Sequence, residues 1–127
     1  MKKALLFGVS LALTASPAAA AYWQLLGSTD TGSIFYIDAA TIQNDGNIVT
    51  YWIKIAARND RTKDFREAKQ QVSINCSERT ITTIDSTFYA PSGRVLESDT
   101  VPLILRKAEP IAPDTIAETE LTYVCKG

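Results

Sequence analysis

The order of apolar and polar residues along the chain predicts a protein built mostly from short β-strands. Aromatic and branched residues gather in six runs that are typical of strands, at residues 21–27, 33–37, 48–57, 66–76, 79–89 and 94–100. Turn-forming residues separate several of these runs, at 28–32, 44–47 and 90–93. Because short turns join neighbouring strands antiparallel, we expect about six strands in a single antiparallel sheet.

The run at residues 66–76 indicates how the predicted sheet faces water. One set of alternating positions is apolar and comprises Ala68, Val72, Ile74 and Cys76. The opposite set is polar and comprises Glu67, Lys69, Gln71, Ser73 and Asn75. Since successive side chains of a strand point to opposite faces, we expect one face of the sheet to be buried and the other to be exposed to water.

The hydrophobic period changes after Pro113 from that of a strand to that of a helix. Apolar residues then recur at i, i+4, i+7 and i+8, which are Ala117, Leu121, Val124 and Cys125. Thr115 and Glu118 have the spacing of a capping box, in which each residue satisfies a backbone N–H at the start of a helix. These features predict a C-terminal helix with one apolar stripe.

Cys76 and Cys125 are the only two cysteines of the chain. Cys76 ends the apolar row of a predicted strand, and Cys125 ends the apolar stripe of the predicted helix. A disulfide between them would therefore hold the helix on the buried face of the sheet. The predicted fold class is α+β and mainly β: a single antiparallel sheet of about six strands, with a C-terminal helix packed on one face and tied by this disulfide.

The N-terminus has the pattern of a secretory signal peptide. Met1-Lys2-Lys3 precedes an apolar run at residues 4–13, and residues 16–21 supply the small side chains of a cleavage site. We expect residues 1–21 to be removed by cleavage after Ala20 or Ala21, leaving residues 22–127 as one domain in the periplasm, in the medium or at the cell surface. No lipid-acceptor cysteine and no second long apolar run follow, so neither a lipoprotein nor a membrane anchor is expected.

Residues spread over nearly all of the mature chain resemble the surface-adhesin protein E-like domains of Gram-negative bacteria. The resemblance is carried by Tyr36-Ile37-Asp38-Ala39-Ala40-Thr41-Ile42, Asp45-Gly46-Asn47, Trp52, Cys76, residues 89–93, Pro113 and Val124-Cys125. It implies an antiparallel sheet whose concave face holds a C-terminal helix through a disulfide. It also implies binding to a protein partner, such as the host matrix proteins vitronectin or laminin.

The charge of the chain does not indicate a nucleic-acid partner. The formal net charge is -1, and it becomes -3 when Lys2 and Lys3 leave with the leader. Basic residues nonetheless gather around one predicted hairpin loop and form a candidate binding loop: Arg58, Arg61, Lys63 and Arg66. Acidic residues interleave with them, so the alternative is a solvated loop without a partner. Trp52 and other strand aromatics are a second candidate surface, although such side chains more often fill a core.

Enzymatic function receives little support from the sequence. The chain has no histidine, and a disulfide accounts for both cysteines, so we expect no catalytic, metal-binding or cofactor-binding residues. The sharpest exception is Asp30-Thr31-Gly32-Ser33, a string carried by aspartic proteases, which need two such loops and would require a homodimer here. A polar hairpin turn is the simpler interpretation.

These observations favour a secreted or periplasmic, non-catalytic binding module. Two alternatives stay open, namely a periplasmic protein with an envelope-associated partner and a homodimeric aspartic protease that uses Asp30. The sequence specifies neither the ligand nor the oligomeric state, and a homodimer stays open.

Overall fold

Residues 20–126 are described by a computed structural model. Within them, eight strands form one antiparallel sheet: β1 (Trp23–Ser28), β2 (Ile34–Asp38), β3 (Gln43–Asp45), β4 (Ile48–Ala56), β5 (Glu67–Asn75), β6 (Thr80–Tyr89), β7 (Val95–Thr100) and β8 (Glu109–Pro110). The other elements are one α-helix, α1 (Ile116–Val124), and two short 3-10 helices, η2 (Ala39–Thr41) and η3 (Leu103–Leu105). The leader predicted at residues 1–21 lies outside the described residues, apart from Ala20 and Ala21.

The strand order follows the chain. The sheet runs β1-β2-β4-β5-β6-β7, while β3 pairs with β4 and β8 pairs with β6. The main path consists of the six strands that the sequence predicts, so the fold class is confirmed and the strand count is corrected from about six to eight. β3 and β8 are three and two residues long, too short to display an alternating pattern.

The hydrophobic core lies on one face of the sheet. In β4 the buried residues Val49, Tyr51 and Ile53 alternate with exposed or half-buried ones, and Tyr51 lies opposite Val72 of β5. The predicted apolar row of β5 is confirmed, because burial is complete or nearly so for Ala68, Val72 and Ile74. A strand pair with matched apolar faces therefore forms the floor on which α1 packs.

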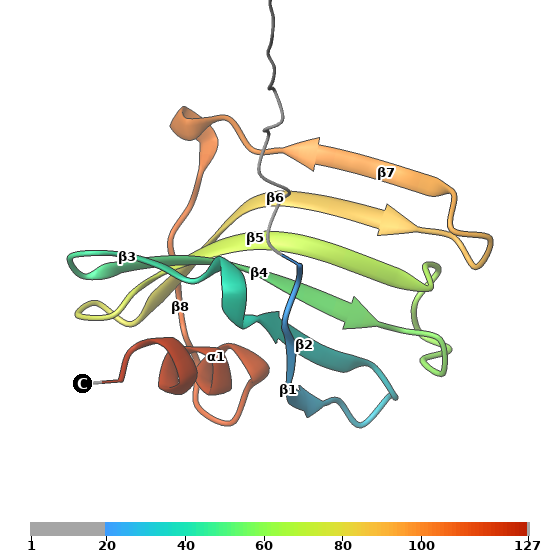
Figure 1. Ribbon diagram of the computed structural model, residues 1–127, viewed down its shortest axis with the longest axis horizontal. Helices are drawn as coiled ribbons and strands as arrows, with labels where there is room; N and C mark the ends of the chain where they lie inside the picture. The colour runs from blue at the N-terminus through green and yellow to red at the C-terminus, as the bar shows by residue number, and fades with distance from the viewer. Residues whose placement is uncertain (1–19, 127) are drawn as a thin grey trace, which may run out of the picture.

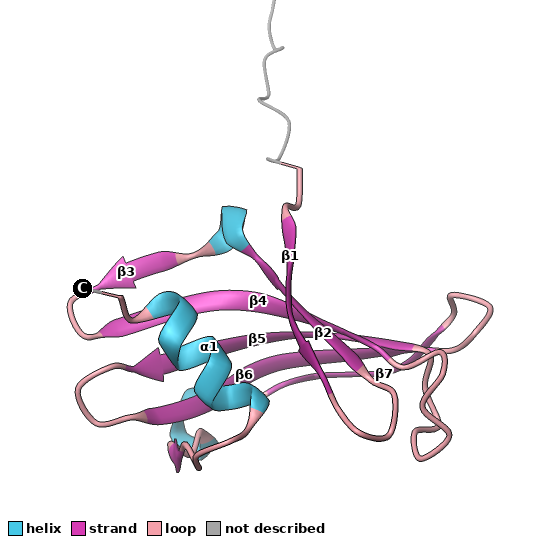
Figure 2. Ribbon diagram, turned by 90° about the horizontal axis from the view of Figure 1, so that it is seen from below, coloured by secondary structure: helices cyan, strands magenta, loops and turns pink. Residues whose placement is uncertain are grey.

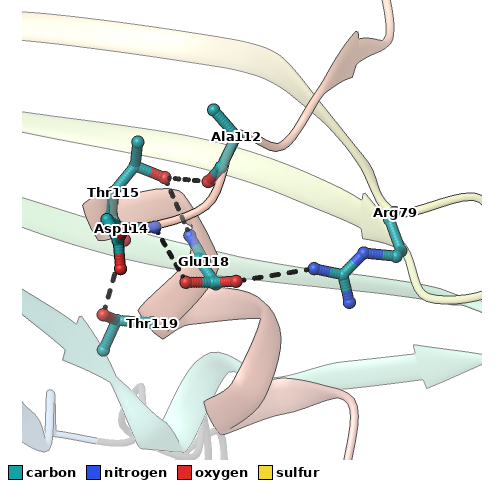
Figure 3. Close-up of polar contacts among 6 residues, drawn as sticks. All are labelled: Arg79, Ala112, Asp114, Thr115, Glu118 and Thr119. Atoms are coloured by element: carbon teal, nitrogen blue, oxygen red, sulfur yellow. Dashed lines mark hydrogen bonds and ion pairs between the residues drawn. The ribbon is translucent and has the colours of Figure 1, made fainter.

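Helix α1 starts as its sequence predicts, with one difference in the cap. The Glu118 backbone N–H donates to Thr115 Oγ1 at 3.2 Å, but Glu118 Oε1 accepts from the N–H of Asp114, at 2.9 Å, and not from that of Thr115. The other carboxylate oxygen of Glu118 lies 3.7 Å from Arg79 Nη2, at the turn before β6 (Figure 3). The start of the helix thus has its own cap and an ion pair with the turn before β6.

The end of α1 is held by the predicted disulfide. The Sγ atoms of Cys76 and Cys125 are 2.04 Å apart, and their Cα atoms are 5.7 Å apart. Figure 1 shows α1 on one side of the sheet, and Figure 2 shows it lying across one end of β4, β5 and β6. The helix therefore covers only part of one sheet face.

Among residues 20–126, no helix combines the length and the apolar character needed to cross a membrane.

Candidate functional site

The connection between β4 and β5, residues 57–66, is organised around one buried carboxylate. Asp60 is 3% exposed and accepts hydrogen bonds from the hydroxyls of Thr31 and Ser33 in the β1–β2 turn. It also accepts from the backbone N–H and the hydroxyl of Thr62 within its own loop. These hydrogen bonds, led by that from Ser33, hold the pKa of Asp60 below its ordinary value. Asp60 therefore joins two loops that are far apart in the sequence.

The string Asp30-Thr31-Gly32-Ser33 forms the turn that docks on this loop. Gly32 has a φ of 109°, and a Cβ added there would lie 2.8 Å from the backbone oxygen of Asn59. Asp30 is exposed, while its neighbours Thr31 and Ser33 donate to Asp60. The hairpin-turn interpretation of this string is confirmed, and its hydroxyls serve to position the 57–66 loop.

The structure brings together three of the four residues of the candidate binding loop. Arg58, Lys63 and Arg66 line one pocket of about 450 Å³, which we call the loop pocket, and Asp64, Phe65 and Pro91 complete its lining. Arg61 is exposed and does not line this pocket. The pocket therefore has three cationic groups and one anionic group around a partly apolar surface.

The walls of the loop pocket are held by contacts to the next hairpin. Arg66 Nη1 donates to the backbone oxygen of Pro91 at 2.7 Å, and the Arg66 N–H donates to the backbone oxygen of Tyr89. The rings of Phe65 and Phe88 meet edge to face with centroids 5.0 Å apart. These contacts join the end of the 57–66 loop to the hairpin between β6 and β7.

The sheet face opposite the core carries cations beside aromatic rings. Lys54 Nζ lies 4.8 Å from the ring centroid of Trp23 and 5.0 Å from that of Tyr36. Lys69 Nζ lies 5.7 Å from the ring centroid of Tyr89. Aromatic rings attract cations at such distances, so these lysines are already partly satisfied within the protein. The lysines and rings of this face are therefore engaged with one another.

One buried charged residue, Glu120, is not among the candidate residues that the sequence predicts. It is 3% exposed within α1, and its Oε1 accepts a hydrogen bond of 2.7 Å from the hydroxyl of Tyr51 in β4. Burial raises the pKa of Glu120 to about 7. The pKa of the Tyr51 hydroxyl is also raised, first by burial and second by the nearby Glu120 carboxylate. The missed signal is positional: Glu120 follows Ala117 by three residues and precedes Val124 by four, on the apolar stripe.

The described residues contain no evident metal centre. Within residues 20–126, no three side chains of His, Cys, Asp or Glu are grouped so that they could hold a metal ion. The titratable groups with clear shifts, Asp60, Tyr51 and Glu120, instead make hydrogen bonds inside the protein.

Comparisons with known proteins agree on one relationship. The sequence model of the family described as surface-adhesin protein E matches residues 23–126. Among solved structures, the chain is similar to Haemophilus influenzae protein E, with 19% identity, a TM-score of 0.55 and coverage of 86% of each chain. A crystal structure of protein E from non-typeable Haemophilus influenzae has 18% identity and a TM-score of 0.54, covering 87% of this chain and 80% of that one. At this identity the structural likeness shows the fold alone. No curated protein sequence matches the chain.

Proposed function

The chain belongs to the surface-adhesin protein E family, and from this premise we propose that it is an exported, non-catalytic module that binds a protein partner through the 57–66 loop. Family membership indicates an adhesin-like surface or exported protein. The proposal adds the binding site and the class of partner. It is carried by one observation, the convergence of Arg58, Lys63 and Arg66 around the loop pocket.

The chemistry of the loop pocket suits an acidic segment that also carries an apolar side chain. Three cations against the single carboxylate of Asp64 leave a local excess of positive charge, although the whole chain is acidic. Phe65 and Pro91 offer apolar surface beside these charges. Vitronectin and laminin, the host matrix proteins implied by the resemblance to the family, are the first partners to test. Because the loop is already fixed through Asp60, binding would order little backbone.

Export is the second part of the proposal. Residues 1–21 would be removed as a signal peptide, and the domain at 22–127 would act in the periplasm, at the cell surface or in the medium. The disulfide between Cys76 and Cys125 supports export, since such bonds form and persist in oxidising compartments.

The non-catalytic part of the proposal rests on the place of the one protease-like string. Asp30 lies exposed in a turn, whereas the paired carboxylates of an aspartic protease share a proton in a common site. The hydroxyls beside Asp30 are engaged with Asp60. Binding is therefore favoured over the homodimeric protease.

The test compares two charge-reversal variants that change the net charge equally. The pocket variant carries Arg58→Glu and Lys63→Glu, while the control carries Arg61→Glu and Arg94→Glu at exposed positions outside the pocket. Surface plasmon resonance would measure binding of residues 22–127 to immobilised vitronectin and laminin. We expect the pocket variant to bind about tenfold more weakly, a loss of about 1.4 kcal/mol, and the control to bind nearly as wild type.

The same variants would be used in a pull-down from envelope extract of the native organism. A partner that wild type retains from this extract, while vitronectin and laminin do not bind, would favour the envelope-associated role over the host-matrix role. Binding of the matrix proteins that falls equally in both variants would show only a general charge effect. That result would remove the loop pocket from the proposal.

A further inference from the structure

A second pocket lies between α1 and the sheet and shares no residue with the loop pocket. It has a volume of about 440 Å³, and we call it the helix pocket. Its walls come from β2, β4, β5, β6, the segment at residues 101–109 and α1, and they include the apolar side chains Phe35, Ile53, Val72, Ile81, Val101 and Ile116. A volume of this order is typical of small-molecule sites, which are largely apolar with a few placed polar groups.

Glu120 supplies the placed polar group of the helix pocket. Glu120 is one of the residues that line the pocket, it is buried, and its Oε1 accepts a hydrogen bond from the Tyr51 hydroxyl. Within residues 20–126, the hydrogen bond from Tyr51 to Oε1 is the one hydrogen bond that this carboxylate accepts. A buried carboxylate with a free oxygen is costly to ionise unless a cation or a donor reaches it. A ligand that brings a cation or a donor to Oε2 would offset this cost.

The charges around Glu120 favour a cation as that group. The charged residues that line the pocket with it are Lys107, between η3 and β8, and Glu109, the first residue of β8. The hydroxyl of Tyr51, from β4, is the titratable group in direct contact with it. With Glu120 ionised, the residues that line the pocket carry two negative charges and one positive charge. This balance disfavours an anionic ligand and leaves one negative charge without a counter-charge.

We propose that the helix pocket binds a primary ammonium group at the end of an aliphatic chain, with Glu120 as its carboxylate partner. The apolar walls would enclose the aliphatic chain and remove its surface from water. The ammonium would donate to Oε2 of Glu120, whose Oε1 stays bonded to Tyr51. A free alkylamine and a lysine side chain of another protein share this chemistry.

Binding of this ligand requires the ionised form of Glu120. Since the pKa of Glu120 is raised to about 7, the ionised fraction rises about tenfold between pH 6 and pH 8. The ligand is cationic throughout this range, as a primary aliphatic amine titrates near pH 10. Affinity should therefore increase about tenfold from pH 6 to pH 8, and binding at pH 6 should release close to one proton from Glu120.

The experiment titrates residues 22–127 with n-hexylamine, n-hexanol and n-hexanoate by isothermal titration calorimetry at pH 6 and pH 8. Buffers of different ionisation enthalpy measure the protons released. Nα-acetyl-lysine amide serves as a further probe, because its affinity relative to hexylamine distinguishes a lysine side chain from a free amine as the source. We expect amine binding that is tighter at pH 8 and that exceeds the binding of hexanol and hexanoate.

Three variants test the assignment of the site. Glu120→Gln keeps an acceptor for Tyr51 but removes the charge, so amine binding at pH 8 should weaken at least tenfold. Thr83→Trp places a large ring at an exposed position that lines the pocket. It should block binding although Glu120 is unchanged. Glu97→Gln, on exposed β7, is the control and should leave binding unchanged.

Three results would overturn the proposal. The first is no amine binding at either pH. The second is equal binding of hexylamine and hexanol with no release of protons, which would describe an apolar groove without a charge partner. The third is hexanoate binding that is tightest at pH 6, which would assign a protonated Glu120 as a donor to an anion.

Discussion

Replacing Glu120 by Gln should change how the stability of the fold depends on pH. The wild-type carboxyl is buried against Tyr51 and has a pKa of about 7, against an ordinary value of 4.5. Between these two values the folded protein binds more protons than the unfolded chain does. Wild-type stability must therefore fall as pH rises from about 4.5 to about 7 and then stop changing from this source. Gln has a similar shape and can still accept from Tyr51, but it does not titrate.

The size of the effect follows from the difference between the two pKa values. A difference of roughly 2.5 pKa units, at about 1.4 kcal/mol per unit, corresponds to about 3 kcal/mol for this nearly fully buried group. Near pH 5, where wild-type Glu120 is neutral when folded, the two proteins should differ by less than about 1 kcal/mol. Near pH 8 the Gln variant should be more stable by about 3 kcal/mol. This is a large part of the net stability of a domain of this size.

Urea denaturation of both proteins at pH 5, 6, 7 and 8 would measure this difference. The chain has no histidine, the side chain whose ordinary pKa lies in the middle of this window. Glu97→Gln on β7 is the matched control, because the same chemical change there is exposed and should not alter the pH profile. Parallel stability curves for wild type and Glu120→Gln would refute the reasoning, as would a Gln variant that is less stable at every pH.

Three further outcomes are expected from other parts of the fold. Replacement of Cys76 and Cys125 together by Ser should lower the free energy of unfolding by about 4 kcal/mol, because the disulfide spans 49 residues; a loss below about 1 kcal/mol in urea denaturation would contradict a clamping role. Gly32→Ala should lower the free energy of unfolding by about 2 kcal/mol or more, since φ is positive and the new Cβ would meet the backbone of the 57–66 loop. Gly46→Ala, where φ is also positive but the space is open, should lower it by only about 1 kcal/mol. Equal losses in the two variants would show that contact with the 57–66 loop does not matter. Asp30→Asn should leave the melting temperature unchanged and reveal no lost activity; pepstatin-sensitive peptide cleavage at acid pH that this substitution abolishes would favour the protease instead.

The sequence predicts the sheet well where one face is buried and poorly where geometry joins distant segments. On β5 the alternation of apolar and polar residues is complete enough to assign faces, and the structure agrees. β3 and β8 are too short for any pattern, and their pairing depends on the long neighbours β4 and β6. Short-range patterns therefore find the long strands and miss the short ones.

The candidate sites show the same limit. The cluster of basic residues at 58–66 is visible in the sequence, but the separation of Arg61 from the other three depends on how the loop is folded. That folding relies on Asp60, whose partners Thr31 and Ser33 are 29 and 27 residues away. Glu120 has the helical spacing of the apolar stripe, but carboxylates are rarely fully buried, so the sequence alone does not place it in the core. Its contact with Tyr51 spans 69 residues, which no local pattern encodes.

The strand order has a consequence for the route by which the chain folds. In the main path each strand pairs with a strand close to it in sequence, so the sheet can grow by adding hairpins, each of which closes a short loop. Helix α1 instead packs on strands that come much earlier in the chain. The disulfide can form only when Cys125 lies close to Cys76. We therefore expect the helix to dock last, so that its contacts slow unfolding and leave the rate of sheet formation almost unchanged.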